Sequence, residues 1–194
     1  LDPQNAQNRL NESIRSDPQD PVTYYLRGQL LSQTGQASRA FDDFGVSLSL
    51  GFDLPEIYAA RGRVAQKLGR RKDALSDFTQ ALYLDSQNAR YHAYKADYFR
   101  TGSEYQPALE SLQRALSLDP ELALTHQFLG LLYHDLELFS KAIEAFDHAI
   151  SLDPKRADAY DSRINANDRR ELFANSGLAT QALEDLKQSF SLEF

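Results

Sequence analysis

The sequence predicts an all-α protein built as an array of paired helices. One observation is a repeat: the stretches that begin at Pro21, Pro55, Ala89 and Ala123 follow one another at intervals of 34 residues without a gap. A second is that each stretch carries apolar residues at the i, i+3, i+4 and i+7 spacing of an amphipathic helix, twice over. A third is that small and large residues recur at fixed positions. Arrays of this kind stack neighbouring units, because no unit buries its apolar face alone.

The recurring positions combine a small residue in the first helix with small and bulky residues in the second. We number positions from the first residue of each stretch and call the two helices of a stretch helix A and helix B. The repeated sets are Gly28, Gly62, Ala96 and Gly130; Ala40, Ala74, Ala108 and Ala142; Phe44, Phe78, Leu112 and Phe146; Ser47, Ala81, Ala115 and Ala149; and Leu50, Leu84, Leu118 and Leu152.

The fourth stretch shows how one unit is specified. In helix A, the residues on one side are His126, Leu129, Gly130 and Tyr133, at helical spacing. Helix B repeats the pattern with Phe139, Ala142, Ile143, Phe146, Ala149 and Ile150. It ends before Pro154, because proline cannot continue the hydrogen-bond ladder. Gly130 and Ala142 allow two backbones to pass closely, and Phe146 fills the space between them.

This order of residues resembles the tetratricopeptide repeat family: an aromatic residue and glycine, then Ala-x-x-x-Phe, then leucine and Asp-Pro, at the same period. The resemblance implies a right-handed superhelical α-solenoid of antiparallel helix pairs, whose A helices line a concave groove that binds proteins. Phe52 and Ser86 depart from the pattern where Pro120 and Pro154 stand elsewhere, and Glu137 replaces the turn glycine seen at Gly35 and Gly69. The packing positions are intact.

We expect a single domain over residues 1–194. Residues 1–20 correspond to helix B of a truncated repeat, with Ala6, Leu10 and Ser13 in its packing positions. Full repeats follow at 21–54, 55–88, 89–122 and 123–156. Residues 157–194 form a fifth repeat with an insertion near 169–176, because Ala182 and Leu186 arrive about six residues late.

The two ends lack the polar caps that close a helical array. This favours a fragment, a processed piece, or a chain whose uncapped ends are covered by self-association. The absence of methionine agrees with removal of an upstream portion.

Composition excludes several classes of function. A net charge of −7 disfavours wholesale nucleic-acid binding, and no apolar run reaches the length of a membrane span. There is no phosphate loop, no nucleophile elbow and no metal-ligand spacing, so we expect neither an enzyme nor a cofactor or small-molecule substrate. His92 and His126 share a position with Tyr24, Tyr58 and Tyr160, which indicates packing rather than metal binding. The compartment stays open between cytoplasm and, after removal of a signal, periplasm.

Paired charges recur on the packing side of the repeats. In repeats one, two and five, arginine occupies the position just before the one that holds the small residue of helix A in the first four repeats. In the same repeats, aspartate lies three residues after the alanine of helix B. Both charges are absent from the fourth repeat, which has Leu129 and Ala145 at these positions. We predict three partly buried intra-repeat ion pairs: Arg27 with Asp43, Arg61 with Asp77, and Arg163 with Asp185. The alternative is a set of unrelated solvated charges.

The concave positions of helix A are the candidate binding site. The principal candidates are Tyr25, Gln29, Arg63, Lys67, Arg90, Asp97, Arg100, Gln127, Leu131, His134 and Asp135. Arg63, Lys67, Arg90 and Arg100 make the middle of this surface basic, and Asp135, Asp158, Asp161 and Asp168 make its far end acidic. The pattern predicts a peptide or protein partner with an acidic segment opposite the basic part. The alternative is a solvated face with mixed charge.

Co-chaperones of the family clamp a C-terminal carboxylate with Lys, Asn, Asn, Lys and Arg. The matching positions here are Tyr25, Gln29, Arg63, Arg90 and Tyr94, so the standard clamp is not present. Two further readings stay open. In one, the chain is the non-catalytic recognition arm of a larger enzyme or assembly. In the other, it binds nucleic acid through a basic run made of Arg61, Arg63, Lys67, Arg70, Arg71 and Lys72.

Overall fold

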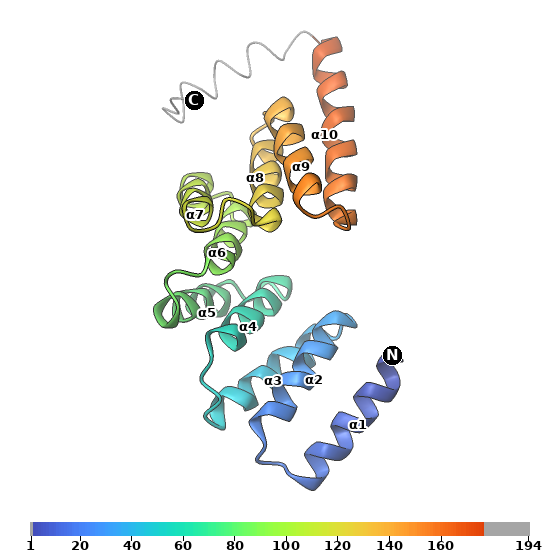
Figure 1. Ribbon diagram of the computed structural model, residues 1–194, viewed down its shortest axis with the longest axis vertical. Coiled ribbons are helices and arrows are strands. Elements are labelled where there is room, and N and C mark those ends of the chain that lie inside the picture. Colours follow the sequence, from blue (N-terminus) through green and yellow to red (C-terminus); the bar gives the residue numbers. More distant parts are fainter. Residues whose placement is uncertain (1, 177–194) are drawn as a thin grey trace. The chain divides into compact units, whose positions relative to one another are not determined.

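A computed structural model describes residues 2–176 of the chain, and this part is α-helical without strands (Figure 1). Its helices are α1 (Pro3–Ser16), α2 (Pro21–Gln33), α3 (Ala37–Ser49), α4 (Pro55–Lys67), α5 (Arg71–Leu84), α6 (Ala89–Thr101), α7 (Tyr105–Leu118), α8 (Ala123–Asp135), α9 (Phe139–Leu152) and α10 (Ala157–Ser176). Four repeats therefore begin where the sequence places them, and the all-α fold is confirmed.

The chain divides into two compact units, Leu1–Gln87 and Asn88–Phe194. In unit 1, α2 packs on α3, α4 packs on α5, and α1 lies against α2. In unit 2, α6 packs on α7, α8 packs on α9, and α10 packs on α9. Each unit thus contains two helix pairs and one further helix that packs on them. The single domain over residues 1–194 stays a prediction.

Close packing between the two helices of a pair depends on the small residue in helix A. A Cβ atom added at Gly130 would lie 2.5 Å from Cε1 of Phe146, and one at Gly62 would lie 2.9 Å from Cε1 of Phe78. Both rings are completely buried. The third repeat has the larger Ala96 in this position and the smaller Leu112 opposite it. Size is therefore matched across each pair.

Helix A ends in the same way in all four repeats. The residue after its cap has a left-handed backbone, with φ of 78° at Gly35, 72° at Gly69, 59° at Ser103 and 60° at Glu137. The next backbone N–H then donates to the carbonyl five residues earlier, as from Leu138 to Tyr133 at 2.8 Å. The departure at Glu137 therefore leaves the turn intact, with a side chain in a conformation that glycine adopts more easily.

The ends of the described part differ from the regular repeats. At the N-terminal end, α1 has no buried residue, and the Ser13 hydroxyl lies 3.3 Å from that of Thr23 on α2. At the other end, α10 is 20 residues long, whereas α2, α4, α6 and α8 have 13 residues each. The helix continues through the expected insertion near 169–176. Over the described residues, none of the helices is long and apolar enough to cross a membrane.

Candidate functional site

Two charged pairs lie inside the repeats of unit 1. Arg27 donates from Nε and Nη2 to the two carboxylate oxygens of Asp43, at 2.7 and 2.8 Å. Arg61 holds Asp77 in the same way, at 2.9 and 2.7 Å. Both aspartates are buried, at 6% and 2% exposure. The geometry is the two-pronged one in which an arginine matches a carboxylate best.

Burial opposes ionisation in the second pair. Burial raises the pKa of Asp77, although Arg61 hydrogen-bonds to its carboxylate and pulls the pKa down. The hydrogen bond from Arg61 to Asp77 in turn raises the pKa of the arginine. Desolvation of the carboxylate thus outweighs the attraction at that group. We expect the pair to fix the helix geometry more than it stabilises the fold, because desolvation of the two groups offsets their attraction.

The third arginine of the set has a different neighbour. Arg163 on α10 donates from Nη1 to Asp147 on α9 at 2.7 Å, and the two side chains are 39% and 52% exposed. Its expected partner, Asp185, lies outside the described residues. Arg163 therefore contacts the preceding helix B through a residue that the sequence pattern did not single out.

The basic run of unit 1 is partly used within the fold. Arg61 holds Asp77 and lies over the ring of Phe41 at 5.5 Å. Arg70 pairs with Asp73 at 2.7 Å and lies over the same ring at 4.0 Å. These two arginines are thus engaged in contacts within the fold, which argues against a nucleic-acid surface formed by the basic run.

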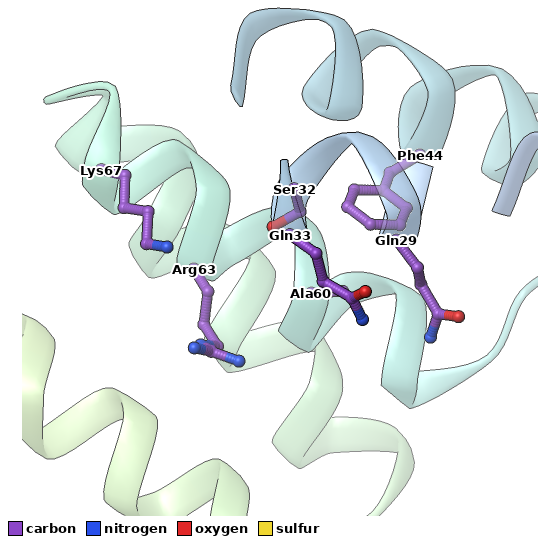
Figure 2. A pocket seen from close by; sticks show the side chains of 7 residues that line it. All are labelled: Gln29, Ser32, Gln33, Phe44, Ala60, Arg63 and Lys67. Atoms are coloured by element: carbon purple, nitrogen blue, oxygen red, sulfur yellow. The ribbon is translucent and has the colours of Figure 1, made fainter. Parts of the chain in front are cut away.

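A pocket of about 200 Å³ lies in unit 1 between α2 and α4 (Figure 2). Its lining residues are Gln29, Ser32, Gln33, Phe44, Ala60, Arg63 and Lys67. Three of them, Gln29, Arg63 and Lys67, are predicted binding residues. Its charged lining residues are Arg63 and Lys67, and no carboxylate is among them.

Tyr25 stands beside this pocket rather than in its lining. Its hydroxyl accepts a hydrogen bond from the side-chain amide of Gln29 at 2.6 Å. Its ring contacts Phe44 and Phe52, with centroids about 6 Å apart in each case. Burial raises the pKa of Tyr25, and Glu56 adds to the shift. Tyr25 therefore stays protonated and orients Gln29.

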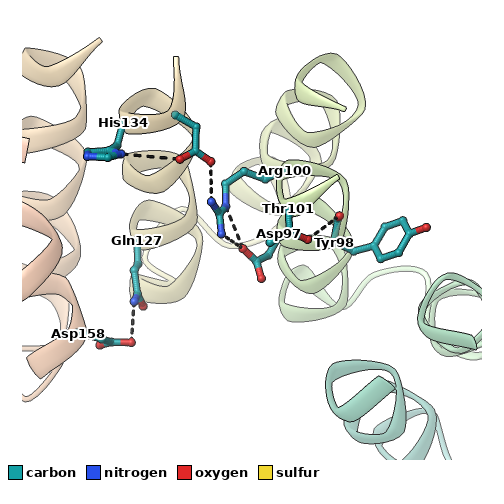
Figure 3. A network of polar contacts seen from close by, with 8 residues as sticks. Asp97, Tyr98, Arg100, Thr101, Gln127, His134 and Asp158 are labelled. Atoms are coloured by element: carbon teal, nitrogen blue, oxygen red, sulfur yellow. Dashed lines mark hydrogen bonds and ion pairs between the residues drawn. The ribbon is translucent and has the colours of Figure 1, made fainter. Parts of the chain in front are cut away.

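In unit 2, a charged network occupies the predicted binding positions of α6 and α8 (Figure 3). Arg100 donates to Asp97 at 2.8 and 3.0 Å, and to Asp135 at 2.6 Å. Burial lowers the pKa of Arg100, but the two carboxylates more than compensate and the net shift is upward. The ring nitrogen Nδ1 of His134 lies 3.7 Å from Asp135. Within the fold, Arg100 is thus paired with two carboxylates.

Gln127 is also committed to contacts within unit 2. It is only 5% exposed, donates to Asp158 at 2.6 Å and accepts from Nε of Arg156 at 2.9 Å. Leu131 is half-buried against Phe146 and its neighbours. Arg90 remains an exposed residue of α6.

The predicted binding residues therefore fall into two groups. Unit 1 contains the polar pocket, and unit 2 contains an internally paired, net acidic network. A groove that runs across both units stays a prediction. The sequence carried a signal for part of the network, because Asp97 and Arg100 are spaced i, i+3 on one helix. Phe44 and Ala60 were not predicted to line a site, since they occupy core and spacer positions. The part of the chain that the structure describes holds no cluster of three or more potential metal ligands.

Comparison with known proteins now identifies the family. Two family models described as tetratricopeptide repeat match residues 59–123 and residues 123–156. The chain belongs to the tetratricopeptide repeat family, whose members are generally non-catalytic interaction scaffolds. Comparison with curated proteins gives no significant match.

Solved structures show the same fold. A tetratricopeptide repeat protein of Thermus thermophilus, TTC0263, is 18% identical with a TM-score of 0.72, over 84% of this chain and 90% of that one. MamA from Desulfovibrio magneticus RS-1 is 25% identical with a TM-score of 0.66, over 80% and 88%. YrrB, described as a tetratricopeptide repeat protein with an unusual peptide-binding site, is 22% identical with a TM-score of 0.61, over 83% of each chain.

Proposed function

We propose that this chain is a non-enzymatic protein-interaction module that binds an extended segment of a partner protein along its A helices. The pocket between α2 and α4 carries the proposal, because five polar side chains from two successive A helices line it. A family of interaction scaffolds supplies the context, and the peptide-binding site described for YrrB is a precedent in the same fold.

The charges of the pocket select the partner. Arg63 and Lys67 are exposed and lie on one face of α4, four residues apart. With no carboxylate in the lining, the pocket attracts an acidic segment. The partner is therefore a peptide or protein whose acidic residues contact unit 1. The volume of the pocket, about 200 Å³, lies below the roughly 300–1,000 Å³ of typical small-molecule sites. A pocket of this size favours a side chain of the partner over a small-molecule substrate.

Selection from a random peptide library displayed on phage tests this function. The intact chain should enrich acidic sequences, and Lys67→Glu should lose them while keeping its helical content. Lys72→Glu is the matched control, since Lys72 is an exposed lysine of α5 outside the pocket. Enrichment of the same sequences by all three proteins would refute a role for the pocket.

A further inference from the structure

We propose that the pocket between α2 and α4 receives a phosphorylated serine or threonine side chain of the partner. This inference rests on the proposed function and deepens it. It specifies a phosphoryl group, whereas the charge of the pocket alone indicates only some acidic group.

The number and placement of hydrogen-bond donors carry the argument. Gln29, Ser32 and Gln33 come from α2, and Arg63 and Lys67 come from α4 (Figure 2). Donors therefore approach the pocket from two different walls. A carboxylate presents two oxygens in one plane, whereas a phosphoryl group presents three oxygens around a tetrahedral centre. A tetrahedral phosphoryl group can therefore accept hydrogen bonds from both walls at once better than a planar carboxylate can.

Several of these donors have spare capacity. Within the described residues, no hydrogen bond or ion pair joins the Ser32 hydroxyl, the Gln33 amide or the Lys67 ammonium to another group of the chain. Gln29 donates to the hydroxyl of Tyr25 at 2.6 Å, and its amide group carries a second N–H. A guanidinium carries five N–H donors, so Arg63 can serve a ligand in addition to its contacts within the chain.

The floor of the pocket limits the alternatives. Phe44 is 1% exposed, and its ring packs against Tyr25 and beneath Gly28, so it offers no face on which a base could stack. Ala60 closes the α4 side with a methyl group. A single phosphorylated side chain needs no stacking surface, whereas single-stranded nucleic acid does. The observations therefore favour a phosphopeptide over RNA.

Three peptide libraries of one design test the inference. Each has random flanks around one fixed residue, which is phosphoserine, glutamate or serine, and retention on the immobilised full chain is measured. We expect the phosphoserine library to be retained about tenfold more than the glutamate library, because a phosphoryl group makes more charge-assisted hydrogen bonds. Lys67→Gln should abolish the preference, and Lys72→Gln should keep it.

Each other outcome overturns the inference in a distinct way. Equal retention of the glutamate and phosphoserine libraries, lost together in Lys67→Gln, refutes the phosphoryl group and leaves the proposed acidic-peptide function intact. Stronger competition by single-stranded RNA than by phosphoserine peptide refutes the phosphopeptide. Retention that is equal for all three libraries, in wild type and Lys67→Gln alike, refutes this inference together with the proposed function.

Discussion

At the scale of single residues, the turn after helix A places two non-glycine residues in the left-handed backbone conformation. Glu137 and Ser103 have φ near +60° where the first two repeats have glycine. A residue with a Cβ pays about 1 kcal/mol or more in this conformation. The turn nevertheless forms, since the backbone hydrogen bonds that close it do not involve a side chain.

Replacing Glu137 by glycine should therefore stabilise the protein. We expect Glu137→Gly to raise the free energy of unfolding by about 1 kcal/mol, less the extra entropy that glycine adds to the unfolded chain. Urea denaturation followed by circular dichroism measures it. Gly69→Ala is the reverse control and should lose a similar amount. A Glu137→Gly variant less stable than wild type would show that Glu137 makes a compensating contact.

A second residue-scale property is the proton affinity of His126. Burial lowers its pKa from 6.5, and His148, with ring centroids 4.2 Å away, lowers it further. The hydrogen bond between Nε2 and the carbonyl of Pro120, at 2.7 Å, only partly opposes this. The unfolded chain consequently takes up a proton at higher pH than the folded chain does.

This difference predicts a pH dependence of stability. Between pH 6.5 and the lower folded pKa, the unfolded state binds more protons, so acidification through this window destabilises the fold. His126→Tyr copies Tyr24 and Tyr58 and removes the titration. Between about pH 7.5 and about pH 5.5, the variant should lose less unfolding free energy than wild type. Parallel pH profiles would show that His126 does not contribute.

Residue-level prediction from sequence worked where the repeat itself provided a comparison. The positions of Arg61 and Asp77 stood out because the same charges recur one repeat earlier and are both absent from the fourth repeat. The contacts of Arg100 were missed, because one of its partners, Asp135, lies on the A helix of the next repeat. A position in the repeat frame says which face a side chain occupies. It does not say which of several neighbours a long arginine reaches.

At the scale of helices, the pair in each full repeat is held by matched sizes, and the pairs of the first two repeats are also held by matched charges. Helix starts were predictable from Pro21 and Pro55, because proline at the first helical position has no N–H to leave unpaired. The length of α10 was not, since the repeat frame offers no template for an insertion. The third and fourth repeats supply natural substitutions for the matched pairs.

Size matching predicts a coupled pair of substitutions. Gly130→Ala places a Cβ where Phe146 already lies, and overpacking of this kind costs about 1–3 kcal/mol, partly offset by the helix propensity of alanine. Adding Phe146→Leu copies Ala96 with Leu112 and should recover much of that loss. A double-mutant cycle in urea measures the coupling. Strictly additive effects would contradict size matching.

Charge matching predicts a second cycle. Arg61→Leu leaves the buried carboxylate of Asp77 without its partner and should cost about 3–5 kcal/mol. The double variant Arg61→Leu with Asp77→Ala copies Leu129 and Ala145 and should be nearly as stable as wild type. If the double variant is as unstable as the single one, the pair contributes net stability rather than geometry.

At the scale of the whole molecule, stability is distributed along the chain. The helices that pack extensively within each unit are neighbours in sequence or one helix removed. Stability is then approximately a sum of local terms, so unfolding need not be two-state, and each substitution is best read with a probe in its own unit.

The sequence predicted the family and the helix pairs because packing positions recur at a fixed interval. It could not predict which charged side chains at the binding positions are paired within the fold and which face a pocket. That division depends on side-chain contacts: Lys67 lines an open pocket, whereas Arg100 is held by two carboxylates. The two cations occupy adjacent concave positions of helix A in the repeat frame, and their contacts in the fold differ.

The most direct measurement of the central claim, that the partner contacts the A-helix pocket of unit 1, is site-specific photo-crosslinking to a phage-selected peptide. A benzophenone side chain is placed either at Gln33, in the pocket, or at Tyr83, which is 81% exposed on α5 outside it. We predict that the peptide crosslinks at position 33 and not at position 83. Crosslinking at position 83, with none at position 33, would contradict the account.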